Sequence, residues 1–287
     1  MAVAETAGRA EVVQRLKAAV AARERERRRR EHAVILTGRV LIVLGLLASW
    51  EALSGRVLDP FFVSSPSRIA RAFVDLLLHH ELLVHAQYTT IETLAGFATG
   101  SAAGIALAFL LTSLGRLYEM TEPILVALYG IPRTALAPLF IMWFGIGITS
   151  KIVIAALFVF FVVFMNTVAG IRGTSPQMVD LVRLMGASGG DVLVKVVLPS
   201  ALPYILTALR IVVPTAMIGA IVGEFISAQR GLGFLISRST FEFSTHAAFA
   251  GIFALMVVVV VMNAAIGAVE RPLMRWRPQQ RISGNGG

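Results

Sequence analysis

Residues Ser175–Pro199 read SPQMVDLVRLMGASGGDVLVKVVLP and form the most informative segment of the chain. The segment joins two long apolar stretches, yet it is itself patterned for helix. Ser175 followed by Pro176 is typical of a helix N-cap with proline in the first turn. Apolar residues then recur at helical spacing and predict one apolar face. That face consists of Met178, Leu181, Val182 and Met185.

Glycines divide this segment into two parts. Gly186 and the pair Gly189-Gly190 predict the end of the first helix. We expect a second short helix over Asp191–Val197, ending at Leu198-Pro199. The whole connector covers residues 172–200, which is long for a compact bundle, and connectors of that length are usually functional. An apolar stripe on such a helix favours either a groove on a partner protein or the lipid surface.

Composition places the rest of the chain in a membrane. Of 287 residues, 56% are hydrophobic and 15% are charged, and the mean hydropathy is +0.77. Soluble domains carry about 45–50% apolar and about 25% charged residues. The chain has no cysteine, which excludes disulfides, thiolate metal sites and thiol redox chemistry.

The sequence predicts an all-α, polytopic membrane protein with six transmembrane helices. A helix needs about 20 mostly apolar residues to cross a bilayer. Small residues at Gly96, Gly100 and Gly104 in the second span predict close approach of another helix. The spans cover residues 33–53, 86–114, 121–145, 150–171, 201–227 and 247–269. Prolines interrupt the third and fifth spans: Pro123, Pro132, Pro138, Pro203 and Pro214.

Positive charge predicts the orientation. An arginine-rich tail over residues 1–32, with interspersed glutamates, precedes the first span, and a second basic tail covers residues 271–287. Positively charged segments stay on the cytoplasmic side. We therefore expect both termini in the cytoplasm, a membrane domain over residues 33–270, and the 172–200 loop on the cytoplasmic side. The other basic positions on that side are Arg116, Arg172, Arg183 and Lys195.

The segment between the first and second spans predicts one more helix. Ser67 resembles an N-cap for a helix over Arg68–His80. The apolar face of that helix is expected to lie on the membrane surface. His79, His80 and His85 follow without a carboxylate at ligand spacing, so we expect no metal site.

The 172–200 loop resembles the EAA loop of permease subunits of ABC importers, which reads Glu-Ala-Ala, three residues, Gly, nine residues, Ile-x-Leu-Pro. Asp180-Leu181-Val182 stands at the Glu-Ala-Ala position, Gly186 follows at the family spacing, and Val196–Pro199 closes the motif. Leu-Val replaces Ala-Ala and Asp replaces Glu. Pro138–Gly147, Leu202–Arg210 and Glu224 followed by Gly231-Leu232-Gly233 resemble the nitrate, sulfonate and taurine branch. The resemblance covers about residues 60–270 and implies the type I importer permease fold.

The resemblance also implies partners. Two permease copies, here expected to be a homodimer, would form the pathway in the inner or plasma membrane of a prokaryote. Two ABC ATPase subunits would dock on the inside, and an extracytoplasmic solute-binding protein would deliver the solute. The loop would couple the ATPases to the spans. The residues carried over to ATPase coupling are Asp180, Leu181, Met185, Gly186, Val196, Leu198 and Pro199.

Three residues are candidates for the solute pathway. Arg133 lies near the middle of the third span, where a charge is costly and usually faces a cavity. It would attract an anionic solute; the alternative is a snorkelling side chain or a pair with Glu92. Met142 would line the pore. Glu224, near the outer end of the fifth span, would contact solute, gate the outer mouth or form an interhelical salt bridge.

Other classes of function fit the sequence poorly. None of the lysines, Lys17, Lys151 and Lys195, ends a phosphate-binding Gly-x-x-x-x-Gly-Lys loop, so we expect no enzyme activity and no cofactor, with ATP bound by a partner. No aromatic residues interleave with the N-terminal arginines, so we expect no nucleic-acid partner. The main rival is a secondary transporter driven by an ion gradient, which would need internal repeats and midplane coupling residues.

Overall fold

The computed structural model describes residues 26–273 except 28, 29 and 32. Most of the two predicted basic tails therefore lies outside the described residues. The N-terminal residues that are described form i,i+4 ion pairs: Arg27 with Glu31 at 2.9 Å and Arg30 with Glu26 at 2.8 Å. The chain divides into two compact units, residues 1–67 and 68–287, each of which has its own internal packing.

The first unit contains an apolar helix over Ala33–Leu53, which confirms the first predicted span as a helix. A short helix, α2 (Pro60–Val63), follows, with Asp59 accepting a hydrogen bond from the backbone N–H of Phe61. The predicted role of Ser67 is wrong. The next helix, α3 (Pro66–Leu78), already begins at Pro66, and Ser67 donates from its N–H and hydroxyl to the Glu51 carboxylate at 2.9 and 2.8 Å.

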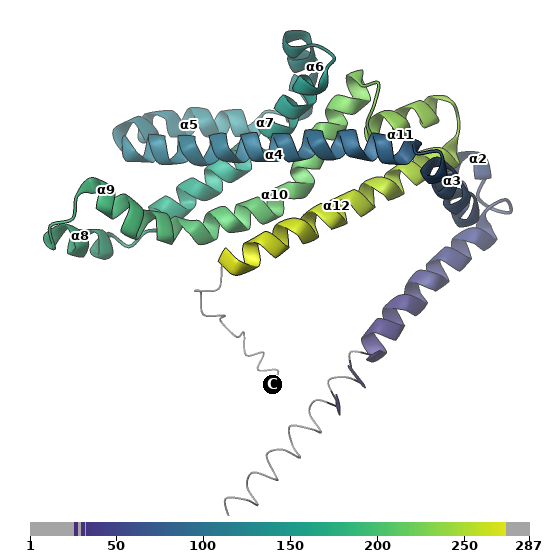
Figure 1. Ribbon diagram of the computed structural model, residues 1–287, viewed down its shortest axis with the longest axis horizontal. Coiled ribbons are helices and arrows are strands. Elements are labelled where there is room, and N and C mark those ends of the chain that lie inside the picture. The colour runs from purple at the N-terminus through teal and green to yellow at the C-terminus, as the bar shows by residue number, and fades with distance from the viewer. Residues whose placement is uncertain (1–25, 28–29, 32, 274–287) are drawn as a thin grey trace, which may run out of the picture. The chain divides into compact units, whose positions relative to one another are not determined.

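The described part of the second unit consists of helices joined by short non-helical connections (Figure 1). Its helices vary from long apolar spans to short connecting turns. They are α4 (Glu81–Ser113), α5 (Arg116–Gly130), α6 (Arg133–Phe144), α7 (Ile148–Arg172), α8 (Pro176–Leu184), α9 (Gly189–Val192), the π-helical turn η1 (Leu193–Val197), α10 (Leu198–Ser227), α11 (Leu232–Phe241) and α12 (Thr245–Leu273).

The core of this unit is α7, which packs between α4 and α10 (Figure 1). Glycines on both neighbours allow the close approach. A Cβ atom on Gly100 of α4 would lie 2.9 Å from Val159 Cβ, and one on Gly219 of α10 would lie 2.7 Å from Ala155 Cα. The predicted role of the Gly96, Gly100 and Gly104 face is confirmed, because that face contacts the α7 backbone directly.

The two spans that were expected to be interrupted by prolines differ from each other. The third is interrupted as predicted at Pro132, where α5 and α6 meet at an angle of 92°, whereas Pro123 and Pro138 lie inside these two helices. Pro132 explains the break, because proline disfavours helical geometry at the preceding residue and lacks an N–H. The fifth span was expected to be broken by prolines, yet α10 runs through Pro203 and Pro214 as one helix. The described residues thus contain five helices long and apolar enough to cross a membrane, or six if α5 and α6 form one broken span.

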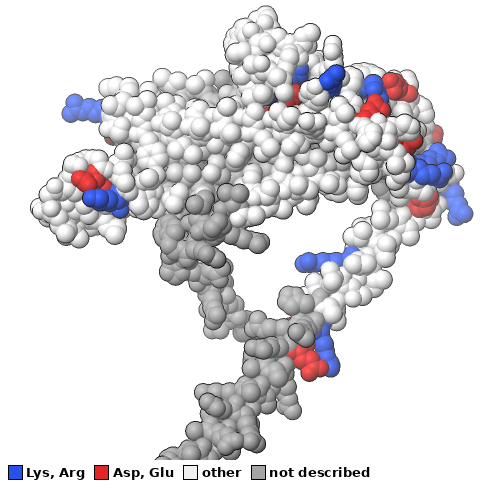
Figure 2. Space-filling model, in the orientation of Figure 1, with Lys and Arg blue, Asp and Glu red and all other residues white. Residues whose placement is uncertain are grey.

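Charged side chains are concentrated near the helix ends of the second unit, and the flank between them is almost entirely uncharged (Figure 2). Part of the apolar face of α3 packs against other helices, so this face does not lie on the membrane surface alone. Phe73 and Leu76 pack against a cluster that includes Leu82, Leu232 and Leu235. This packing fixes α3 beside the start of α4 and α11.

Candidate functional site

The 172–200 loop forms a helical hairpin tip with an exposed apolar stripe. Helix α8 begins after the N-cap Ser175 with Pro176 in its first position, as predicted. Asp180 lies on this helix and is exposed. The exposed fractions of the apolar side chains are large: 58% for Met178, 59% for Leu181, 87% for Leu184 and 79% for Met185.

Gly186 ends α8 in the left-handed conformation, with φ +86°. The N–H of Gly186 donates to Arg183 O at 2.9 Å, and the N–H of Ala187 donates to Val182 O at 3.2 Å. These two bonds form the Schellman motif, in which a glycine normally occupies the left-handed position. The predicted turn at Gly186 is therefore confirmed, and its geometry explains the residue type.

The second predicted helix of the loop is wrong in both its boundaries. Gly189 and Gly190 do not stop a helix but begin α9, because Ser188 and Asp191 form a capping box in front of it. Leu198 and Pro199 do not end it either, since α9, η1 and α10 follow one another without a break. The N–H of Leu198 donates to Leu193 O, an i to i−5 bond, and this π-turn accommodates Pro199 in the next helix.

The structure separates the predicted coupling residues into two groups. Val196 is buried, with an exposed fraction of 8%, and has a packing role. The others are exposed at the tip or at the base of the loop: Asp180, Leu181, Met185, Gly186, Leu198 and Pro199. Lys195, one turn after Asp191, forms an ion pair with it at 2.6 Å. The tip of the loop therefore exposes an apolar surface, and the short helices that carry it have capped ends.

Arg133 is the first residue of α6, directly after the break from α5. Its guanidinium carbon lies 4.7 Å from the ring centroid of Tyr129, 5.7 Å from that of Phe158 and 5.9 Å from that of Phe161. Arg133 therefore lies at the bend of the interrupted third span. Met142, further along α6, is 70% exposed.

Glu224 of α10 is fully enclosed, with an exposed fraction of 1%. Its carboxylate accepts from the Thr89 hydroxyl at 2.6 Å and from the backbone N–H of Gly233 at 2.5 Å. Glu92 and Lys151, each 3% exposed, interact electrostatically with Glu224 across the α4, α7 and α10 packing. An outer-mouth position open to solute, one of the predicted alternatives, does not fit this enclosure.

Sequence reasoning missed Lys151 and Thr89 as partners of Glu224. Lys151 donates from Nζ to Ser227 O at 2.9 Å and to the carbonyls of Ile146 and Gly147, which ties the start of α7 to the end of α10. The signal was present, because Lys151 is one of only three lysines and lies within an apolar span.

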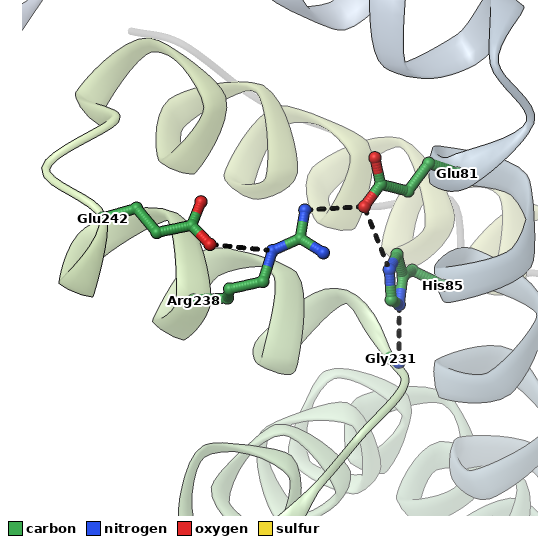
Figure 3. A network of polar contacts seen from close by, with 5 residues as sticks. All are labelled: Glu81, His85, Gly231, Arg238 and Glu242. Atoms are coloured by element: carbon green, nitrogen blue, oxygen red, sulfur yellow. Dashed lines mark hydrogen bonds and ion pairs between the residues drawn. The ribbon is translucent and has the colours of Figure 1, made fainter.

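A second polar network joins α4 to α11 (Figure 3). Arg238 Nη2 lies 2.6 Å from Glu81 Oε1, and Arg238 Nε lies 3.7 Å from Glu242 Oε1. Glu81 Oε1 also lies 3.8 Å from His85 Nε2, and His85 Nδ1 accepts from the Gly231 N–H at 3.0 Å. Among the described residues no group of three or more His, Cys, Asp or Glu side chains is placed to hold a metal ion.

Known proteins resemble this chain over most of its length. Residues 100–275 match the model for the binding-protein-dependent transport system inner membrane component. The formylaminopyrimidine transport permease protein ThiX of Halalkalibacterium halodurans is 36% identical over 240 residues, 84% of this chain and 96% of that protein. The putative aliphatic sulfonates transport permease protein SsuC of Bacillus subtilis is 32% identical, with 83% of this chain and 87% of that protein covered.

Solved structures agree with these relatives in fold. An inward-facing conformation of the MetNI methionine ABC transporter shares 22% identity with this chain at a TM-score of 0.55. The similarity covers 69% of this chain and 97% of that one. An amino acid ABC transporter crystallised with histidines gives a TM-score of 0.56 at 18% identity, with 71% and 97% covered.

Proposed function

This chain belongs to the family of binding-protein-dependent transport system inner membrane components, and on that premise we propose that it forms the translocation pathway of an ATP-driven importer for a small anionic solute. Its helices embed it in a membrane, which we infer to be the inner or plasma membrane of a prokaryote. In the proposed orientation both termini and the 172–200 loop are cytoplasmic, in agreement with the distribution of basic residues.

The observation that carries this proposal is the exposed apolar stripe of α8. Leu184 and Met185 are 87% and 79% exposed at the tip of a loop that packs little against the rest of the chain. An exposed apolar stripe with helical spacing favours insertion into a groove on a partner protein. We therefore propose that a separate ABC ATPase subunit receives α8, with Asp180, Leu181 and Met185 at the contact and Gly186, Leu198 and Pro199 fixing the loop.

The remaining partners follow from the proposed importer. A second copy of this chain would complete the pathway, and an extracytoplasmic solute-binding protein would deliver the solute. ATP would be bound by the ATPase subunits, so this chain would need no cofactor and perform no hydrolysis.

The solute is proposed from relatives and from one residue. SsuC relatives are named for aliphatic sulfonates and TauC of Escherichia coli for taurine, whereas ThiX is named for formylaminopyrimidine and RibX for riboflavin. Arg133 favours the anionic group among these, because its guanidinium lies at the bend of the broken span with aromatic rings around it. We propose a solute with an anionic group: an aliphatic sulfonate, taurine through its sulfonate, or a nitrate-like anion.

The proposal is tested by purification from gently solubilised native membranes. Leu184→Glu introduces a charge in the stripe, and Gln177→Glu introduces a charge at another exposed position of α8 as a matched control. We expect an ATP-binding subunit to co-purify with the wild type and with Gln177→Glu, and to be lost with Leu184→Glu.

Uptake into proteoliposomes provides the second measurement. Uptake that requires ATP and a solute-binding protein would support the importer. Uptake driven by an ion gradient without ATP, together with no co-purified ATPase, would contradict it and favour a secondary transporter, for which buried Glu92 and Glu224 supply titratable groups.

A further inference from the structure

A charged cleft lies between α3, the end of α11 and the start of α12. Its volume is about 690 Å³. Figure 2 shows basic and acidic side chains gathered at this end of the second unit. The charged groups that line the cleft are Arg68, Arg71 and Asp75 of α3, Arg238 of α11, Glu242 directly after it, and His246 of α12. We call this set of residues the α3–α11 cleft.

We propose that the α3–α11 cleft binds the headgroup of a zwitterionic phospholipid that carries a primary ammonium group. Its position relative to the spans is the first argument. The apolar helix α12 begins at Thr245, beside the cleft, and α4 begins at Glu81, which contacts the cleft residue Arg238. Spanning helices begin and end at the headgroup layer that borders the hydrocarbon core. The cleft therefore lies at the depth of lipid headgroups.

The charges of the cleft are the second argument. Three guanidinium groups and two carboxylates line the cleft, so it contains both signs, and Glu81 beside it already pairs with Arg238. Arg68 and Arg71 are three residues apart on α3 and share one face of it. Guanidinium groups match phosphate oxygens in geometry as well as in charge. An ammonium group next to that phosphate would be attracted by Asp75 and Glu242.

Arg238 adds a local reason for a polar ligand. Its Nη2 is bound to Glu81 at 2.6 Å, but its buried Nε has no hydrogen-bond acceptor, with Glu242 Oε1 at 3.7 Å. A buried donor without an acceptor is unfavourable, because it has lost its hydrogen bonds to water. A phosphate oxygen in the cleft would supply this acceptor.

Exposed apolar side chains on the elements that form the cleft favour a lipid over a free headgroup. Val74 and Leu78 of α3 are 51% and 71% exposed, and Phe241 and Phe243 at the end of α11 are 81% and 71% exposed. Aromatic and aliphatic side chains at this depth contact the upper acyl chains. A lipid bound in the cleft has acyl chains that can contact these side chains, and a soluble phosphate ester has none.

The proposal is tested by native mass spectrometry of the purified full chain, with whatever subunits accompany it, after delipidation. Phosphatidylethanolamine, phosphatidylglycerol and phosphatidylcholine are titrated separately. The double variant Arg68→Gln/Arg71→Gln is compared with Arg56→Gln/Arg116→Gln, which removes the same charge from exposed positions outside the cleft. Equal melting temperatures without added lipid exclude misfolding.

We expect phosphatidylethanolamine to bind the wild type and the control pair alike, and the cleft variant at least about tenfold more weakly, as for a lost charge-assisted contact. Equal binding by the cleft variant would overturn the proposal. Tighter binding of phosphatidylglycerol or phosphatidylcholine than of phosphatidylethanolamine would overturn the ammonium assignment. Displacement of the lipid by equimolar phosphoethanolamine would show a small-ion site instead. If the cleft variant no longer co-purified with a solute-binding protein but still bound lipid as the wild type does, the cleft would be a protein docking surface instead.

Discussion

The imidazole Nδ1 of His85 accepts a hydrogen bond from the backbone N–H of Gly231 across 3.0 Å, which joins α4 to the segment between α10 and α11. The next two N–H groups are held in the same way. The N–H of Leu232 donates to Thr89 Oγ1 at 2.8 Å, and that of Gly233 donates to Glu224 Oε2 at 2.5 Å. Three consecutive N–H groups at the start of α11, which have no partner within the helix, are thus each satisfied by a buried side chain.

Glycine is required at the first of these positions. Gly231 has φ +116°, outside the range of L side chains, and a Cβ atom there would lie 2.6 Å from Glu224 Oε2. The carboxylate can therefore contact this segment only because no side chain intervenes. Gly231, His85, Thr89 and Glu224 together fix where α11 begins.

The first prediction concerns the acceptor on His85. His85→Leu leaves the buried N–H of Gly231 without a partner, which should destabilise the protein by about 1–3 kcal/mol. His85→Asn places a side-chain oxygen near the position of Nδ1 and should lose less. Thermal unfolding in detergent measures both. If the two variants melted at the same temperature, the hydrogen bond would have no role in stability.

The second prediction concerns the Thr89 hydroxyl, which joins α4 to Glu224 of α10 and to Leu232 of α11. Thr89→Val keeps the shape of the side chain but removes both the donor to Glu224 and the acceptor for Leu232, so we expect a loss of about 1–3 kcal/mol. Thr90→Val is the matched control, because the Thr90 hydroxyl bonds only within its own helix, to Ala86 O. A loss of similar size in the control would contradict the interhelical role.

Much of this fold could be predicted from sequence, because apolar length and small-residue spacing are local signals. The membrane class, the glycine face of α4 and the capped start of α8 follow from such signals. The interruption of the third span at Pro132 also follows from the sequence, but the continuous passage of α10 through Pro203 and Pro214 does not, since proline breaks a helix or not according to the packing around it.

The polar sites were predicted less well than the spans. Glu224 was identified as a single charged residue, but its partners Thr89, Lys151 and Gly233 come from three different elements. Sequence spacing gives no distance between residues that are far apart in the chain. From sequence, Gly231 and Gly233 are part of a family resemblance, whereas the structure shows that they provide N–H groups and space for a carboxylate.

The third prediction compares two glycines in apolar helices. A Cβ atom on Gly100 would lie 2.9 Å from Ala156 Cα, so Gly100→Ala should force α4 away from α7 and cost about 1–3 kcal/mol. Gly38, in the Ala33–Leu53 helix, has no atom within 4 Å of the same position. Gly38→Ala should therefore stabilise that helix, by about 0.5–1 kcal/mol. Melting temperatures that move in the same direction in both variants would contradict the packing argument.

The fourth prediction concerns the end of α8. Gly186→Ala places a Cβ atom in the left-handed conformation at a cost of about 1–2 kcal/mol, which should loosen the Schellman motif. Gly189→Ala is the control, because Gly189 has open space around it and no positive φ. We expect Gly186→Ala to reduce the yield of a co-purified ATPase subunit and Gly189→Ala to leave it unchanged. If the two variants gave equal yields of the ATPase subunit, the left-handed turn at Gly186 would not be needed for partner binding and the prediction would be wrong.

The last prediction tests Arg133 as the determinant of an anionic solute. The guanidinium stacks over Tyr129 at 4.7 Å, so both its charge and its planar shape are positioned at the bend. Arg133→Gln removes the charge and should lower uptake of an aliphatic sulfonate at least about tenfold, while uptake of a neutral solute of similar size changes little. Arg133→Lys should be intermediate, since an ammonium group keeps the charge but not the stacked geometry.

Tyr129→Phe provides the control for packing alone, because it keeps a ring beneath the guanidinium and should leave both rates unchanged. Proteoliposome uptake with labelled solutes measures all three variants. Equal retention of anionic and neutral uptake in Arg133→Gln would mean that the arginine packs at the bend without contacting solute. An equal loss of both would mean that it holds α5 and α6 in their relative positions, since a structural defect does not distinguish solutes by charge.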